Sequence, residues 1–168
     1  MKLFISFLSA SLLFISCESN KDNIANQKFQ KNAKTVLALI ESDQNNKTDY
    51  SSFSKDFKSI NTSFGDTLEF LNLKEYIENS KKMHEILEIK LVETPVLLPG
   101  VDAKTGVADG SVRFYGIWEF KLKKTATYES KTARLKGYES YDFDNEGKII
   151  IQQAYGDLSG LANFLFKK

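Results

Sequence analysis

The 168-residue sequence contains only one cysteine, one histidine, one tryptophan and two prolines. The single cysteine, Cys17, excludes a disulfide bond within the chain, so the domain depends on its own hydrophobic core. One histidine and scattered carboxylates do not form a spaced ligand set, and we predict no metal site. A glycine-rich phosphate loop and a nucleophile elbow are also missing, so we predict no cofactor. The 23 basic and 22 acidic residues nearly balance, which argues against nucleic acid as a partner.

The one long apolar run of the sequence lies at its N-terminus. It covers residues 3–15, follows Lys2 and is followed by Ser16 and Cys17. A helix that crosses a bilayer needs roughly 20 apolar residues, so this run is too short and instead has the order of a signal peptide. The polar segment after Cys17 contains no cluster of positive charge that would stop transfer.

The end of this run, LFISC, is similar to the lipobox of bacterial lipoproteins. The resemblance implies that residues 1–16 are a lipoprotein signal peptide and that Cys17 carries the lipid after cleavage. Two or three acyl chains hold a protein stably at a membrane. We therefore expect the membrane as a partner and a location at the cell membrane or outer membrane, with the domain outside the cytoplasm. The alternative is an ordinary secreted protein in which Cys17 is incidental.

Hydrophobic periodicity predicts three helices in the first half of the domain. Residues 17–26 are polar, and we expect them to form a flexible tether between the lipid and a domain at residues 27–168. The helices are expected from apolar residues at helical spacing: Phe29, Ala33, Val36, Leu37 and Ile40 in the first, Tyr50, Phe53 and Phe57 in the second, and Ile77, Ser80, His84 and Leu87 in the third. Asp49 is a candidate cap for the second.

After the third helix the period changes to two, which is typical of strands. Alternation predicts strands at residues 88–93, 111–122, 132–143 and 148–157, with a tight turn at DNEG between the last two. Helices followed by antiparallel strands indicate an α+β domain. Residues 93–110 are the one long irregular segment, and loops of that length are often functional, so this segment is a candidate lid.

The last predicted hairpin, YESYDFDNEGKIIIQQAYGDLSGL at residues 138–161, resembles that of the NTF2-like or SnoaL-like superfamily. The resemblance implies a cone in which three N-terminal helices pack on the concave face of a curved antiparallel sheet, with a pocket between them. Some members of that superfamily are isomerases, dehydratases or cyclases, and others have no known chemistry. Many dimerise through the sheet, which implies a homodimer. The charged residues on the presumed outer face predict a weak dimer or none.

Alternation places candidate pocket residues on three strands. Trp118 shares the inward face of its strand with large apolar residues, and Tyr141 shares a face with Leu135. In the last strand Gln153, Tyr155 and Asp157 fall on the same side as Ile149 and Ile151, so we expect all three to line the pocket. Asp157 is a candidate acid or base, and the alternative is that it caps the turn that follows.

His84 is a further catalytic candidate, because histidine titrates near neutral pH. The alternative is a residue at the edge of the core with a local hydrogen bond. The predicted pocket contains aromatic side chains and few titratable groups, so the leading hypothesis is a non-catalytic domain that binds a small apolar molecule or a protein partner. The alternative is an isomerase, dehydratase or cyclase in which Asp157 moves a proton and Tyr155 or Tyr141 stabilises the oxyanion.

Overall fold

The computed structural model describes residues 15–167 apart from 61, 66 and 68, with side chains from residue 23 onward. The elements follow in the order α1 (Ile15–Gln44), the short 3-10 turn η1 (Tyr50–Ser52), β1 (Phe53–Ile60), β2 (Phe70–Asn72), α2 (Leu73–Ile86), β3 (Leu87–Leu91), β4 (Val96–Val101), β5 (Ala108–Leu122), β6 (Lys131–Phe143), β7 (Ile149–Tyr155) and α3 (Leu158–Phe166). The predicted signal peptide lies almost wholly outside the described residues, and so does the side chain of Cys17.

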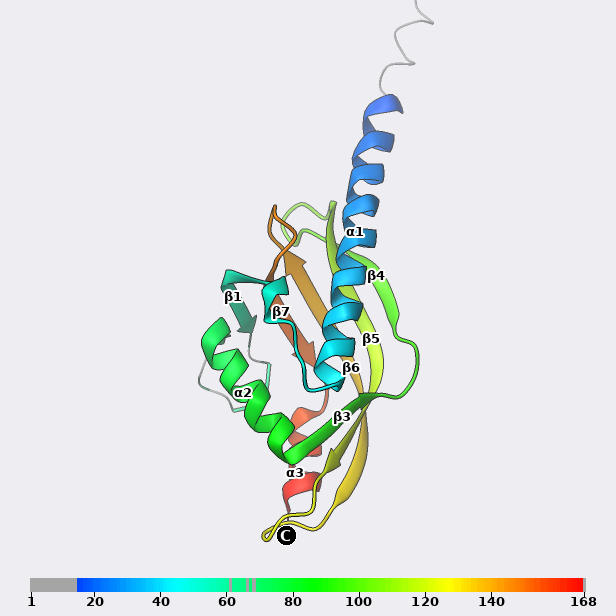
Figure 1. The fold of residues 1–168 in the computed structure, drawn as a ribbon. Helices are drawn as coiled ribbons and strands as arrows, with labels where there is room; N and C mark the ends of the chain where they lie inside the picture. The colour runs from blue at the N-terminus through cyan, green and yellow to red at the C-terminus, as the bar shows by residue number, and fades with distance from the viewer. Residues whose placement is uncertain (1–14, 61, 66, 68, 168) are drawn as a thin grey trace, which may run out of the picture.

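The strands form one seven-stranded sheet in the order β2-β1-β7-β6-β5-β3, and β4 also pairs with β5. Neighbouring strands are antiparallel except β1 and β7, which run parallel. The sheet is curved and open, and α1 crosses one face of it while α2 lies beside β1 (Figure 1). This arrangement confirms the predicted α+β cone, with a mixed sheet in place of a purely antiparallel one.

The core lies between α1 and the sheet. Its buried side chains come from both sides of this interface: Phe29, Ala33, Val36, Leu39 and Ile40 from the helix, and Phe53, Phe57, Val112, Phe114, Tyr141 and Ile149 from the strands. Leu37, which the sequence placed in the helical stripe, is 40% exposed, and Leu39 takes its place. The stripe begins at Ala25, and the turns of α1 before it project beyond the sheet (Figure 1). Residues 17–26, which the sequence predicted to be a flexible tether, belong to α1 in the structure and are helical.

The second predicted helix is wrong, because residues 53–60 form strand β1. Phe53 and Phe57 are four residues apart, and that spacing keeps two side chains on one face in a helix and in a strand alike. Both are buried, with their ring centroids 4.7 Å apart, and β1 pairs with β7. Asp49 does act as a cap, but of η1, where its carboxylate accepts a hydrogen bond from the Ser51 amide at 3.0 Å. Of the described helices, α1 and α2 therefore precede strands β3 to β7, and α3 follows them.

Residues 93–110 are not irregular as predicted. They contain strand β4, the turn after it and the first residues of β5. Strand β4 pairs antiparallel with β5, with Val96 opposite Tyr115 and Pro99 opposite Val112. Proline is tolerated here because β4 has a neighbour on one side only. Among the residues that the structure describes, no helix combines the length and the apolar character needed to cross a membrane.

Candidate functional site

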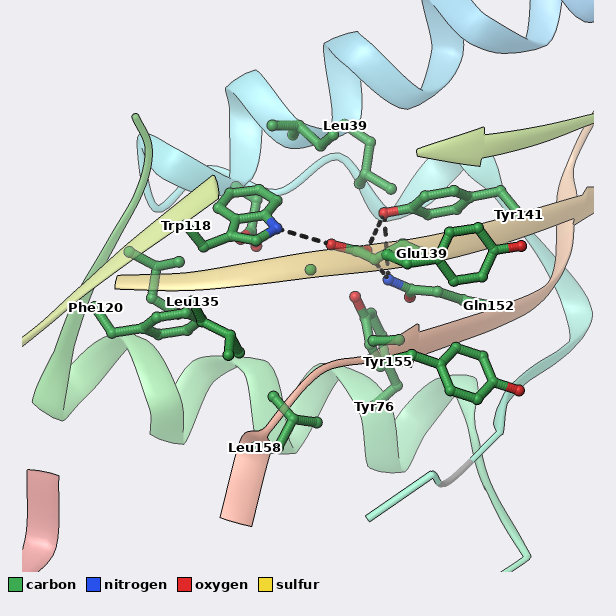
Figure 2. A pocket seen from close by; sticks show the side chains of 16 residues that line it. Leu39, Tyr76, Trp118, Phe120, Leu135, Glu139, Tyr141, Gln152, Tyr155 and Leu158 are labelled. Carbon is green, nitrogen blue, oxygen red and sulfur yellow. Dashed lines mark hydrogen bonds between the residues drawn. The ribbon is translucent and has the colours of Figure 1, made fainter. Parts of the chain in front are cut away.

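A cavity of about 170 Å³ lies between α1, α2 and the inner face of the sheet (Figure 2). Its walls are mostly apolar and aromatic, and the lining residues include Leu39, Ile40, Tyr76, Ile89, Trp118, Phe120, Leu135, Tyr141, Ala154 and Leu158. Three polar side chains join them: Asp43, Glu139 and Gln152. A concave, largely apolar pocket with a few converging polar groups is the usual form of a small-molecule site.

Glu139 is the polar centre of this cavity. Residues 135, 137, 139 and 141 of β6 share one face by the two-residue period, and that face lines the cavity. The Glu139 carboxylate accepts hydrogen bonds from Trp118 Nε1 at 3.1 Å, from the Tyr141 hydroxyl at 2.5 Å and from Gln152 Nε2 at 3.2 Å (Figure 2). Donors from β5, β6 and β7 therefore hold this carboxylate in one orientation.

Burial governs the protonation of the groups around Glu139. Removal from water raises the pKa of Glu139 above its ordinary value, and the three hydrogen bonds offset only part of this effect. The negative charge of Asp43 on α1 raises it further. Burial also raises the pKa values of Tyr76 and Tyr141, so both phenols stay neutral at physiological pH. A carboxyl group whose pKa is raised inside a cavity marks a candidate functional site.

Asp43 and His84 form a pair at the edge of the cavity. His84 Nε2 lies 3.0 Å from Asp43 Oδ1, which also accepts a hydrogen bond from the Thr48 hydroxyl at 2.8 Å. Asp43 lines the cavity, whereas His84 on α2 contacts Asp43 and is not part of the lining. His84 is thus a residue at the edge of the core with a local partner, and the structure does not bring it together with Asp157.

Neither a protein-family model nor a curated protein sequence matches this chain. Solved structures do. An NTF2-like protein from Burkholderia xenovorans LB400 superposes with a TM-score of 0.59 at 16% identity, covering 83% of this chain and 96% of that one. A SnoaL-like protein from Shewanella denitrificans OS-217, assigned as a polyketide cyclase, has a TM-score of 0.58 at 13% identity, covering 82% and 98%. The chain has an NTF2-like fold. The BvnE pinacolase from Penicillium brevicompactum shares it, with a TM-score of 0.60 at 13% identity, covering 83% and 92%.

A β-bulge in the NTF2-like domain changes which residues of β7 face the cavity. Phe143 pairs with Ile149 and Asp142 pairs with Ile151, so β7 contains one extra residue between these pairs. Beyond the bulge the alternation is reversed, and Gln152 and Ala154 line the cavity.

Gln153 and the Tyr155 ring lie on the other side of the sheet. Tyr155 borders the cavity, but its ring points away from it (Figure 2) and its hydroxyl donates to Gln153 Oε1 at 3.4 Å. The ring packs beside Tyr138, with centroids 5.8 Å apart. Of the predicted pocket residues, Trp118 and Tyr141 therefore lie together at the cavity with their side chains inward, whereas Gln153 does not.

Asp157 is the N-cap of α3 and lies outside the cavity lining. Its carboxylate accepts a hydrogen bond from the Gly160 amide at 2.8 Å, which satisfies one free N–H of the first helical turn. Its side chain is exposed to solvent. The geometry fits the capping alternative and gives Asp157 no contact with a molecule in the cavity.

We expect Asp157→Ala to lower the free energy of unfolding by about 1 kcal/mol, because an alanine cannot accept the capping hydrogen bond. Asp157→Asn keeps an accepting oxygen and should stay within a few tenths of a kcal/mol of the wild type. Urea denaturation measures both changes. A loss of stability as large for asparagine as for alanine would contradict the capping role.

Glu139 is the candidate site residue that the sequence reasoning missed. The same two-residue period that places Leu135 and Tyr141 on the inward face of β6 also places Glu139 there. A lone carboxylate on an otherwise apolar strand face is the signal that could have found it, because buried charge is rarely kept without a use.

The raised pKa of Glu139 predicts a pH dependence of stability. A carboxyl group with a raised pKa in the folded state stabilises the fold fully below its unfolded pKa, and this contribution is lost as the pH rises through the folded pKa. We therefore expect the wild type to lose stability relative to Glu139→Gln as the pH rises above about 4.3. Urea denaturation of both proteins at a series of pH values measures the difference.

Taking this difference removes the effects of titratable groups far from Glu139, which both proteins share. The groups that face Glu139 are Asp43 on α1, Tyr76 on α2 and Tyr141 beside it on β6, and their interaction with the carboxylate is part of the difference. A difference that stays flat with pH, or that rises in favour of the wild type, would show that Glu139 is not buried as described.

Proposed function

We propose that this domain binds a compact, mostly apolar small molecule in its cavity and that Glu139 holds the polar end of that molecule. The position of the Glu139 carboxylate supports this proposal. Three neutral donors fix it inside an apolar cavity, at a cost in desolvation that a binding or chemical role explains.

The volume of the cavity limits the size of the ligand. An engineered protein cavity of about 150 Å³ binds benzene, so a cavity of about 170 Å³ fits one aromatic ring or a chain of similar bulk with a short polar arm. Larger fused-ring molecules exceed this volume. Solved structures with this fold include one described as a SnoaL-like polyketide cyclase and one described as a pinacolase, which supports a small organic molecule as the ligand.

The single tryptophan of the chain provides a direct test, since Trp118 donates its indole N–H to Glu139 within the cavity. Proton–nitrogen NMR spectra then contain one indole signal. We expect monocyclic fragments from a small library to shift this signal in the wild type. The same fragments should leave it unchanged in Ala154→Leu, where the added side chain occupies the cavity. No shift with any fragment, or equal shifts in both proteins, would contradict the proposal.

Acid–base catalysis is the second candidate function, and the raised pKa of Glu139 favours it. In this candidate Glu139 takes a proton from a carbon atom of the bound molecule and returns it to another atom, as in an isomerisation. The neutral phenol of Tyr76 lines the same cavity and can donate a hydrogen bond to the oxygen that becomes negative, whereas the Tyr141 hydroxyl already donates to Glu139. Asp157 has no part in this scheme. Exchange of substrate hydrogen for deuterium in D2O, followed by NMR on carbonyl-containing fragments that bind, would detect such proton transfer.

We further propose that Cys17 carries a thioether-linked lipid that anchors the domain to a membrane. The apolar run, the small residue at position 16 and the cysteine support this proposal. In such a protein the projecting turns of α1 would separate the cone from the lipid surface by about 1.5 Å for each helical residue.

A further inference from the structure

Two side chains at the centre of the cavity, Gln152 and Glu139, have acceptor positions without a donor. The Gln152 amide donates from Nε2 to Glu139 Oε2 at 3.2 Å and to the Tyr141 oxygen at 3.4 Å, which fixes the orientation of the amide. Its other end, Oε1, is buried and accepts no hydrogen bond of normal geometry from the described residues, although the Tyr76 phenol lies close to the same amide. A buried acceptor without a donor destabilises the protein, because it has lost its hydrogen bonds to water. A ligand that brings a donor to this point would remove this destabilisation.

The Glu139 carboxylate also has capacity left. An ionised carboxylate offers about four acceptor positions, and protein donors occupy three of them: Oε1 receives the Trp118 N–H, and Oε2 receives the other two. One position on Oε1 therefore remains. The two acceptors that remain belong to side chains in direct contact with each other (Figure 2).

The charge of the cavity has one sign. Two carboxylates, Glu139 and Asp43, line it, and among the described lining residues there is no lysine or arginine. Asp43 has His84 as its partner, but all three donors to Glu139 are neutral groups. A buried carboxylate without a positive partner is costly, and a cation entering the cavity would offset that cost.

The walls suit a cation as well. Trp118 and Tyr76 both line the cavity near Glu139, and Phe120 adds a third ring (Figure 2). The faces of aromatic rings attract cations, tryptophan most strongly. An aromatic wall with a carboxylate at its centre is thus chemically matched to an ammonium group attached to an apolar body.

We propose that the ligand of this cavity is a compact organic cation, a protonated amine on an apolar body about the size of one ring. Its ammonium group donates to Glu139 Oε1 and Gln152 Oε1. The inference rests on the binding function proposed above and specifies the chemical class of the ligand. An ammonium group carries three donors and no acceptor, which meets both free acceptors and supplies the missing positive charge.

Three probes of one shape test this inference: benzylamine, benzyl alcohol and benzoate, each titrated into the wild-type protein by calorimetry at pH 7. The amine is cationic, the alcohol is a neutral donor and the carboxylate is an anion. We expect benzylamine to bind at least about tenfold more tightly than benzyl alcohol, since a charge-assisted hydrogen bond exceeds a neutral one by about 1.4 kcal/mol. Benzoate should not bind.

Glu139→Gln should weaken benzylamine at least about tenfold and change benzyl alcohol less than about threefold. Glu119→Gln is the matched control, because Glu119 lies outside the cavity lining and pairs with Arg134 at 2.9 Å. Its binding constants should equal those of the wild type. The ranking of the three probes on the wild type needs no variant, so a folding defect in Glu139→Gln leaves the test intact.

The outcomes separate the two proposals. Binding of benzyl alcohol as tight as that of benzylamine, or tighter binding of benzoate, overturns the inference about the cation and leaves the binding function standing. Failure of all three probes to bind overturns the binding function and the inference together. Preference for the amine that survives Glu139→Gln also overturns the inference, because the charge would then be recognised elsewhere.

Discussion

Phe114→Ala is expected to lower the free energy of unfolding by about 3–5 kcal/mol. The Phe114 side chain is completely buried on β5, where it packs 5.7 Å, centroid to centroid, from the Trp118 ring and joins the core beneath α1. Truncation removes the apolar contacts and leaves a hole that the surrounding strands cannot close. Domains of this size are stable by about 5–15 kcal/mol in total, so the loss is a large share. Urea denaturation followed by circular dichroism measures it.

Phe64→Ala is the control for that experiment. The Phe64 side chain is 96% exposed, and the same chemical truncation there should change stability by no more than about 0.5 kcal/mol. Equal losses for the two variants would contradict the placement of the core between α1 and β5.

Cys17→Ser is expected to move the protein from the membrane fraction to the soluble fraction of bacterial cells. Serine has no thiol to accept the lipid, and each buried CH2 of an acyl chain contributes about 0.8 kcal/mol to membrane binding. With two or three such chains missing, the membrane binding that they provide is lost. Cell fractionation and the intact mass of the purified chain measure the two consequences together.

Ser19→Ala, two residues further along the chain, is the matched control. This variant should stay in the membrane fraction and should carry the same added acyl mass as the wild type. If Cys17→Ser still sediments with membranes and the wild type shows no added acyl mass, the proposal of a lipid anchor is wrong.

Most of the fold could be predicted from hydrophobic periodicity, and its failures have specific causes. The stripe of α1 and the long alternation of β5 each contain enough turns or residues to distinguish a helix from a strand. The short segment with Phe53 and Phe57 does not, because a spacing of four fits both periods. Its strand conformation comes from pairing with β7, which lies about a hundred residues further along the chain. Residues 96–101 likewise become a strand through pairing with β5.

The site could be predicted on two strands and not on the third. Trp118 and Tyr141 follow the simple alternation of β5 and β6, and the structure places both at the cavity. On β7 a single extra residue reverses the alternation, and nothing in the local sequence IIIQQAY indicates which residue is the extra one. Gln152 therefore takes the position that alternation assigned to Gln153.

The most direct test of the binding cavity is a nuclear Overhauser measurement between a bound monocyclic fragment and the single indole of the chain. We expect contacts from the fragment to the indole N–H proton of Trp118 and to the methyl groups of Leu135, since both residues line the same cavity. Contacts instead to the ring of Tyr115, which lies outside the cavity lining and is 45% exposed, would place the ligand elsewhere and contradict the proposed site.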